Sequence, residues 1–111
     1  MFNNTNVTTN AGGIPYISST NVTVGTESVD IALGFRRIQP VGYFTVRMAA
    51  AIPSGTTGTL PITLTLNGTT RALTWPNGTA VTVENLNEVS TFLVFNDRFN
   101  GILNLMSRTG N

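Results

Sequence analysis

This sequence of 111 residues contains no cysteine, no histidine and no lysine, and only 10% of its residues are charged. Without cysteine, the chain can form neither a disulfide nor a thiolate metal site. Without histidine or lysine, its serine and threonine hydroxyls lack the side-chain bases that commonly activate such nucleophiles. These absences argue against the commonest kinds of catalytic and metal-binding site.

The few acidic residues leave paired carboxylates as the remaining acid–base chemistry. Glu27 with Asp30, and Glu84 with Glu88, are the pairs that lie close in sequence. Each pair falls at the margin of an expected strand, where acidic side chains are usually solvated. We therefore predict a protein that is not an enzyme, with no catalytic residue, no cofactor, no metal site and no small-molecule substrate.

The positive charge consists of arginine alone, and the formal net charge is +1. Nucleic-acid binding needs a basic stripe, which this composition does not supply. Arg36 and Arg37 form the densest positive charge, and we expect one of them to be solvated and the other to lie at an interface or in an ion pair. The sequence has no apolar run of about 18 residues and no signal-like N-terminus, so we predict no contact with nucleic acid or membrane.

The stretch 59–75, TLPITLTLNGTTRALTW, carries the clearest structural pattern. Apolar residues alternate with polar ones from Leu60 to Leu66, as in a strand with one buried face. Asn67-Gly68 then supplies the two residues that a type I′ hairpin turn requires. The predicted cross-strand pairs on the buried face are Leu66 with Thr69, Leu64 with Arg71, Ile62 with Leu73, and Leu60 with Trp75.

Short alternating segments separated by Gly, Pro and Asn recur along the rest of the chain. Turn signals about every 8–12 residues indicate an all-β fold, a single sandwich or small barrel of about seven or eight short antiparallel strands. Residues 1–13 are polar and rich in asparagine, and we predict an extended N-terminal arm that is flexible or ordered by a partner. Residues 14–111 form the predicted β domain.

The last two predicted strands are apolar on both faces. In 91–95, Phe92 and Val94 point to one side while Leu93 and Phe95 point to the other, and 102–106 repeats this pattern. One face of a sheet in a two-layer fold normally meets water, so either the N-terminal arm or another subunit should cover the second face. The residues that we predict at an interface are Phe2, Val7, Arg36, Arg37, Phe92 and Val94.

Three segments, some of them already described, carry a family resemblance: LTLNGTTRALTW, GTAVTV and LVFNDRFNGILNLM. Together they resemble the small capsid auxiliary (decoration) proteins of crAss-like tailed bacteriophages, over roughly residues 14–106. The resemblance implies a virion structural protein on the capsid surface that reinforces the shell. Its implied partners are the major capsid protein and neighbouring copies of itself.

Other functions remain open at this point. A carbohydrate-binding module would present Trp75, Tyr16 or Tyr43 as a stacking platform, although the hairpin register favours a core position for Trp75. A fibre or tail subunit would trimerise on its own. A secreted adhesin would need a signal upstream of this sequence.

Overall fold

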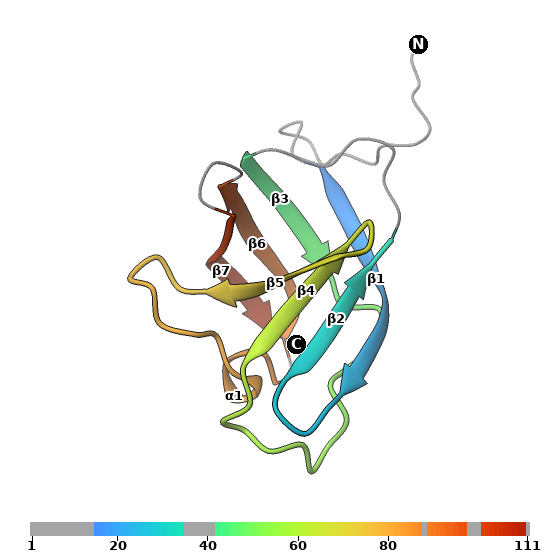
Figure 1. The fold of residues 1–111 in the computed structure, drawn as a ribbon. Coiled ribbons are helices and arrows are strands. Elements are labelled where there is room, and N and C mark those ends of the chain that lie inside the picture. Colours follow the sequence, from blue (N-terminus) through green and yellow to red (C-terminus); the bar gives the residue numbers. More distant parts are fainter. Residues whose placement is uncertain (1–14, 35–41, 88, 98–100, 111) are drawn as a thin grey trace.

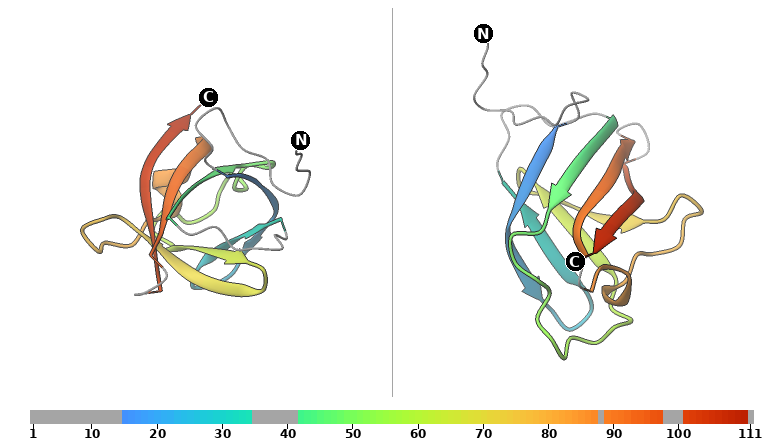
Figure 2. Two further views of the ribbon diagram at one scale, coloured as in Figure 1. Left: turned by 90° about the horizontal axis from the view of Figure 1, so that it is seen from above. Right: turned by 180° about the vertical axis from the view of Figure 1, so that it is seen from behind.

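The structure is a computed structural model that describes residues 15–34, 42–87, 89–97 and 101–110. Its elements are β1 (Tyr16–Val24), β2 (Val29–Leu33), β3 (Gly42–Arg47), β4 (Ile62–Leu66), β5 (Thr69–Thr74), α1 (Val83–Leu86), β6 (Val89–Asp97) and β7 (Ile102–Gly110). Figure 1 shows β2, β4 and β5 at the front with β3, β6 and β7 behind, and Figure 2 shows the strands surrounding a common interior. The all-β prediction is confirmed.

The strands close into a barrel in the order β1-β2-β4-β5-β7-β6-β3. The barrel alternative is therefore correct and the sandwich is not. The prediction of purely antiparallel strands is also wrong, because β1 with β3, β2 with β4, and β5 with β7 are parallel pairs. A closed ring of seven strands needs at least one parallel pair, since antiparallel neighbours alternate in direction and an odd ring cannot alternate throughout. The predicted arm, residues 1–13, lies outside the described residues.

The core fills the inside of the barrel, as expected for a barrel of this strand number. Strands β2 and β4 show strict alternation of buried and half-buried residues, which is the two-residue period of a strand with one face inward. The fully buried large side chains come from every strand and from the segment around α1. They are Phe44, Phe92, Ile17, Ile31, Ile62, Leu64, Leu73, Leu86, Leu105, Val29, Val46 and Val81.

The β4–β5 hairpin forms at the predicted turn. Leu66 pairs with Thr69 and Leu64 with Arg71, so the predicted register is confirmed near the tip. Asn67 has φ 52° and Gly68 has φ 85°, the two positive values that a type I′ turn needs. Local sequence is enough to determine this region because the turn residues and the strand pattern agree.

Further from the tip, the hairpin opens, and the predicted pairs of Ile62 with Leu73 and of Leu60 with Trp75 are not formed. Val81 lies between the two strands instead: its N–H donates to the carbonyl of Leu73 at 3.0 Å, and its carbonyl accepts from the N–H of Ile62 at 2.8 Å. Along its other edge, β5 pairs with β7 through Leu73 and Thr74, so the sheet continues round the barrel.

Gly68→Val should destabilise the protein by about 1–3 kcal/mol, because a β-branched side chain is strained at positive φ. Urea unfolding would measure the loss as a lower midpoint. Gly55 also has positive φ, 86°, so it shares this penalty and is a poor comparison. Gly58 has no positive φ, and its Cβ would meet Glu84 Cβ at an ordinary 3.5 Å. Equal costs for Gly68→Val and Gly58→Val would contradict the role assigned to the turn.

Candidate interaction surface

The structure corrects the predicted orientation of the apolar strand β6. Phe92 is 1% exposed and Val94 is fully buried, so both belong to the core and neither can contact a neighbouring subunit. Their partners across β3 are Val46 and Phe44, which are buried as well. The sequence pattern could not show which residues of β6 face the core, because both faces of this strand are apolar and no polar face marks the outside.

The remaining predicted interface residues, Phe2, Val7, Arg36 and Arg37, lie outside the described residues.

The outer face of β3, β6 and β7 is unusually apolar. Among the described residues, Tyr43 (46% exposed), Ile102 (40%) and Met106 (39%) are three of the four exposed large hydrophobic residues, and all lie on these strands. Leu93 and Phe95 of β6 are half-buried between them. We call Tyr43, Leu93, Phe95, Ile102 and Met106 the outer apolar face. Figure 2 (right) shows the three strands side by side from behind.

The register arranges this face in rows across the three strands. Tyr43 lies opposite Phe95, and their rings meet edge to face with centroids 5.1 Å apart. This pairing holds two aromatic side chains in place at the surface without burying them, since Tyr43 keeps nearly half of its area exposed. Met106 is the extra residue of a bulge, because Leu105 pairs with Val94 while Ser107 pairs with Leu93.

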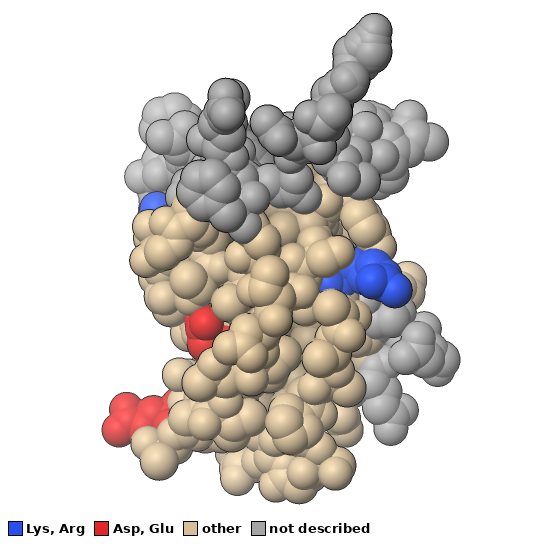
Figure 3. Space-filling view, turned by 90° about the vertical axis from the view of Figure 1, so that its right-hand side faces the viewer, with Lys and Arg blue, Asp and Glu red and all other residues tan. Residues whose placement is uncertain are grey.

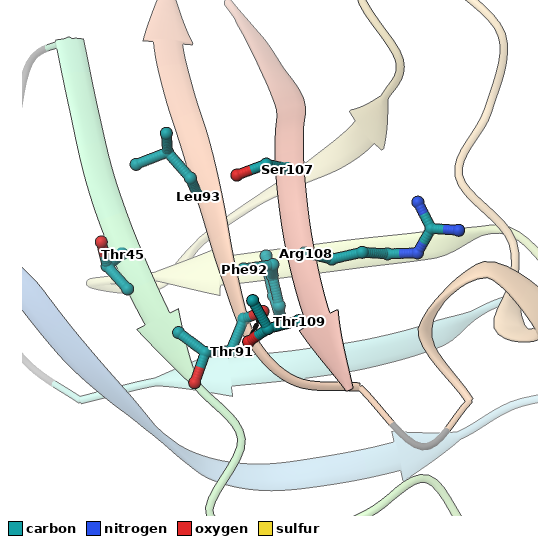
Figure 4. Close-up of a pocket in the computed structure, with 7 residues that line it drawn as sticks. All are labelled: Thr45, Thr91, Phe92, Leu93, Ser107, Arg108 and Thr109. Carbon is teal, nitrogen blue, oxygen red and sulfur yellow. Dashed lines mark hydrogen bonds between the residues drawn. The ribbon is translucent and has the colours of Figure 1, made fainter. Parts of the chain in front are cut away.

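A shallow hollow of about 270 Å³ lies further along the same strands. Its lining residues are Thr45 from β3, Thr91, Phe92 and Leu93 from β6, and Ser107, Arg108 and Thr109 from β7. Figure 4 shows Leu93 and Ser107 beside each other, and shows that the guanidinium of Arg108 points away from them. The hollow is therefore a weakly polar depression with an apolar contribution from Leu93, not a charged binding site.

Arg108 instead lies against Trp75. Its guanidinium carbon is 5.2 Å from the centre of the indole ring, within range of a cation–π interaction. Trp75 is half-buried and packs against the core, as the hairpin pattern indicated. The indole ring of Trp75 thus packs against the core, and its face lies next to the guanidinium of Arg108. Trp75 is therefore a poor stacking platform for a sugar.

The other side of the barrel, formed by β2, β4 and β5, carries a polar network. Asp30 accepts hydrogen bonds from Thr63 Oγ1 at 2.7 Å and from Thr65 Oγ1 at 2.8 Å. Thr65 Oγ1 is also 2.7 Å from Thr70 Oγ1. These bonds link three neighbouring strands on their outer face.

Seen from the right-hand side of Figure 1, the described surface is almost wholly uncharged, with a few isolated charged groups (Figure 3).

No protein family, curated protein or solved structure matches this chain. Within the described ranges, no three acidic side chains are grouped so that they could hold a metal ion. Helix α1 has four residues, and no helix in these ranges is long enough to cross a membrane. The class that the structure itself defines is a seven-stranded β-barrel with one apolar and one polar outer side.

Sequence reasoning identified 102–106 as apolar on both faces but did not include Ile102 or Met106 among the predicted interface residues, and it considered Tyr43 only as a possible sugar platform. A signal for the β7 residues was present in the apolar run from Ile102 to Met106, which includes outward positions. Tyr43 carried no such signal, since its role depends on its pairing with Phe95 from a distant part of the chain.

Proposed function

We propose that this protein is a non-catalytic structural subunit that binds the outside of a phage capsid shell and reinforces it. One observation carries the proposal: most of the large hydrophobic side chains exposed on the described barrel gather on one side of it. Exposed apolar side chains gathered on one side of a domain are typical of protein–protein contacts. The identity of the assembly rests on the family resemblance described above.

The two sides of the barrel support an asymmetric placement. The outer apolar face is suited to contact with a neighbouring subunit of the shell, because burying each large hydrophobic side chain completely contributes roughly 1.5–3 kcal/mol. The side with Asp30, Thr63 and Thr65 satisfies its polar groups internally and is suited to water. A single weak contact becomes effective when it is repeated over many copies on one particle.

The low charge is consistent with this role. An ordinary globular domain is about 25% charged, whereas this one is at 10%, which gives a free monomer little electrostatic protection against association. In a closed barrel, most strand edges are paired, so contacts with neighbours use side-chain faces. A subunit embedded in an assembly needs no stronger charge.

A carbohydrate-binding function has one observation in its favour, the exposed ring of Tyr43 near the hydroxyl-lined hollow. A glycan array would distinguish the two functions, since the structural subunit should bind no glycan.

Attachment to particles tests the proposal. Ile102→Arg places a charge on the outer apolar face and should reduce co-sedimentation with capsid shells that lack this protein by at least about tenfold, or about 1.4 kcal/mol. Val24→Arg is the matched control, because Val24 is 43% exposed but lies on β1. Both variants should keep the thermal midpoint of the wild type. Equal attachment of both variants, or no attachment of the wild type, would overturn the proposal.

A further inference from the structure

We infer that one end of the barrel binds a carboxylate group, through the guanidinium of Arg71 and the carboxamide of Asn96. This is the end at which β3 and β7 begin and β6 ends, at the top of Figure 1. Both side chains belong to the inner sides of their strands, where most other positions are apolar. The inference goes beyond the proposed function and does not depend on it.

Arg71 lies on the inner side of β5. The register places it opposite Leu64, which is fully buried, so the two side chains leave the same face of the hairpin. Arg71 is half-buried, and its guanidinium reaches the start of β7. A Cβ built on Gly101 would lie 3.1 Å from Nη1 of Arg71. The absence of a side chain at Gly101 therefore leaves room for the guanidinium at this end of the barrel.

The guanidinium of Arg71 has no partner of its own. Among the described residues, no hydrogen bond, ion pair or ring contact engages it, in contrast to Arg108, which lies against Trp75. A guanidinium carries five N–H donors and is always charged in proteins. Removing part of such a group from water without an acceptor is unfavourable. An acceptor bound at this end of the barrel would satisfy donors that the folded chain leaves unused.

Asn96 brings a second polar group to the same end. It lies on the inner side of β6 and is 5% exposed. Asn96 pairs with Leu103, two residues beyond Gly101, so it lies diagonally across from the guanidinium at the start of β7. Its partner on the other side is Gly42, where a built Cβ would meet no described atom within 4 Å. Open space therefore lies beside these inward polar groups.

The chemistry of the two groups selects a carboxylate. The planar fork of a guanidinium binds both oxygens of a carboxylate, and a carboxamide donates a further N–H bond. Asp97 is not placed to fill this role, because it follows Asn96 on β6 and so points to the outer side of the strand. A single guanidinium also suits a singly charged anion better than a phosphate, which proteins usually hold with several cationic groups or backbone N–H groups.

Titration of the purified full chain with sodium acetate tests the inference, with sodium chloride at the same ionic strength as the reference. Two-dimensional proton–nitrogen NMR should show saturable shifts of the Arg71 side chain, the Asn96 carboxamide and the Gly101 amide. We expect a Kd of about 1–10 mM, since so small a ligand makes few contacts. Shifts that grow without saturation, or that chloride reproduces, would overturn the inference.

Two variants locate the site. Arg71→Gln should weaken acetate binding at least about tenfold, because it removes the charge and the fork. Arg71→Lys keeps the charge without the fork and should weaken binding by about threefold or more. Arg47→Gln is the matched control, because Arg47 is exposed on β3, and should bind acetate as the wild type does. Equal losses in Arg71→Gln and Arg47→Gln would overturn the inference.

Stability separates a binding role from a structural one. Because Arg71 has no bond to lose, Arg71→Leu should keep or raise the thermal midpoint measured without acetate, and acetate should no longer raise it. In the wild type, acetate should raise the midpoint relative to chloride. A marked fall of the midpoint in Arg71→Leu would show that the guanidinium stabilises the barrel itself, which would overturn the inference.

Co-sedimentation with capsid shells distinguishes two sources of the carboxylate. If an acidic side chain or a C-terminus of a shell subunit supplies it, Arg71→Gln should lose attachment and saturating acetate should release the wild type. If a free small carboxylate is the ligand, attachment should be the same for the wild type and Arg71→Gln. The NMR titration needs no particles, so a wild type that binds acetate but never attaches to shells would overturn the capsid proposal alone. A wild type that attaches to shells but binds no acetate would overturn only the carboxylate site.

Discussion

Phe92→Ala should destabilise the barrel by about 3–5 kcal/mol, the usual cost of removing a buried phenylalanine ring. Phe92 is 1% exposed and lies opposite Val46 of β3, so its removal leaves a cavity that the closed barrel can fill only in part. A domain of this size has about 5–15 kcal/mol of total stability, so the loss is a large fraction of it. Chemical denaturation followed by tryptophan fluorescence would measure the change through Trp75.

Leu93→Ala is the matched control for this prediction. Leu93 is the next residue on β6 but points outward and is half-buried, so its truncation should cost about 1 kcal/mol or less in the isolated protein. The same variant should weaken contacts made through the outer apolar face. A result in which Leu93→Ala destabilises the protein as much as Phe92→Ala would show that the inward and outward sides of β6 have been assigned incorrectly.

Asp30→Ala should lower the free energy of unfolding by about 1.5–3 kcal/mol. The carboxylate accepts hydrogen bonds from Thr63 and Thr65, and bonds to a charged group contribute more than neutral ones. It joins β2 to β4, a parallel pair whose ladder brings together strands that are not consecutive in the chain. The expected value is moderate because the threonine hydroxyls, once released, are near enough to the surface to bond with water.

Glu27→Ala is the control for Asp30→Ala, because Glu27 is an exposed carboxylate in the turn between β1 and β2. Its removal should change stability by no more than about 0.5 kcal/mol. A double-mutant cycle of Asp30→Ala with Thr65→Val should reveal a coupling of at least about 0.5 kcal/mol. Independent, additive effects of the two substitutions would contradict the hydrogen-bonded network.

The hairpin at Asn67-Gly68 and the all-β class were predictable from the sequence. A two-residue turn specifies its own geometry, and the apolar period of the flanking strands specifies which of their faces is buried. Composition alone excludes disulfides and thiolate metal sites, because the chain has no cysteine, and it shows that few residues are charged. These features depend on residues that are close in sequence or on no spatial arrangement at all.

The tertiary structure decided which side of β6 faces inward and where the apolar contact surface lies. The pattern from Thr91 to Phe95 is apolar on both faces, so only the pairing with β3 distinguishes Phe92 from Leu93. The insertion of Val81 between β4 and β5 also depends on a partner, as does the closure of the ring through parallel pairs. A strand's own residues determine its period, but its neighbours, brought together from distant parts of the chain, determine its orientation.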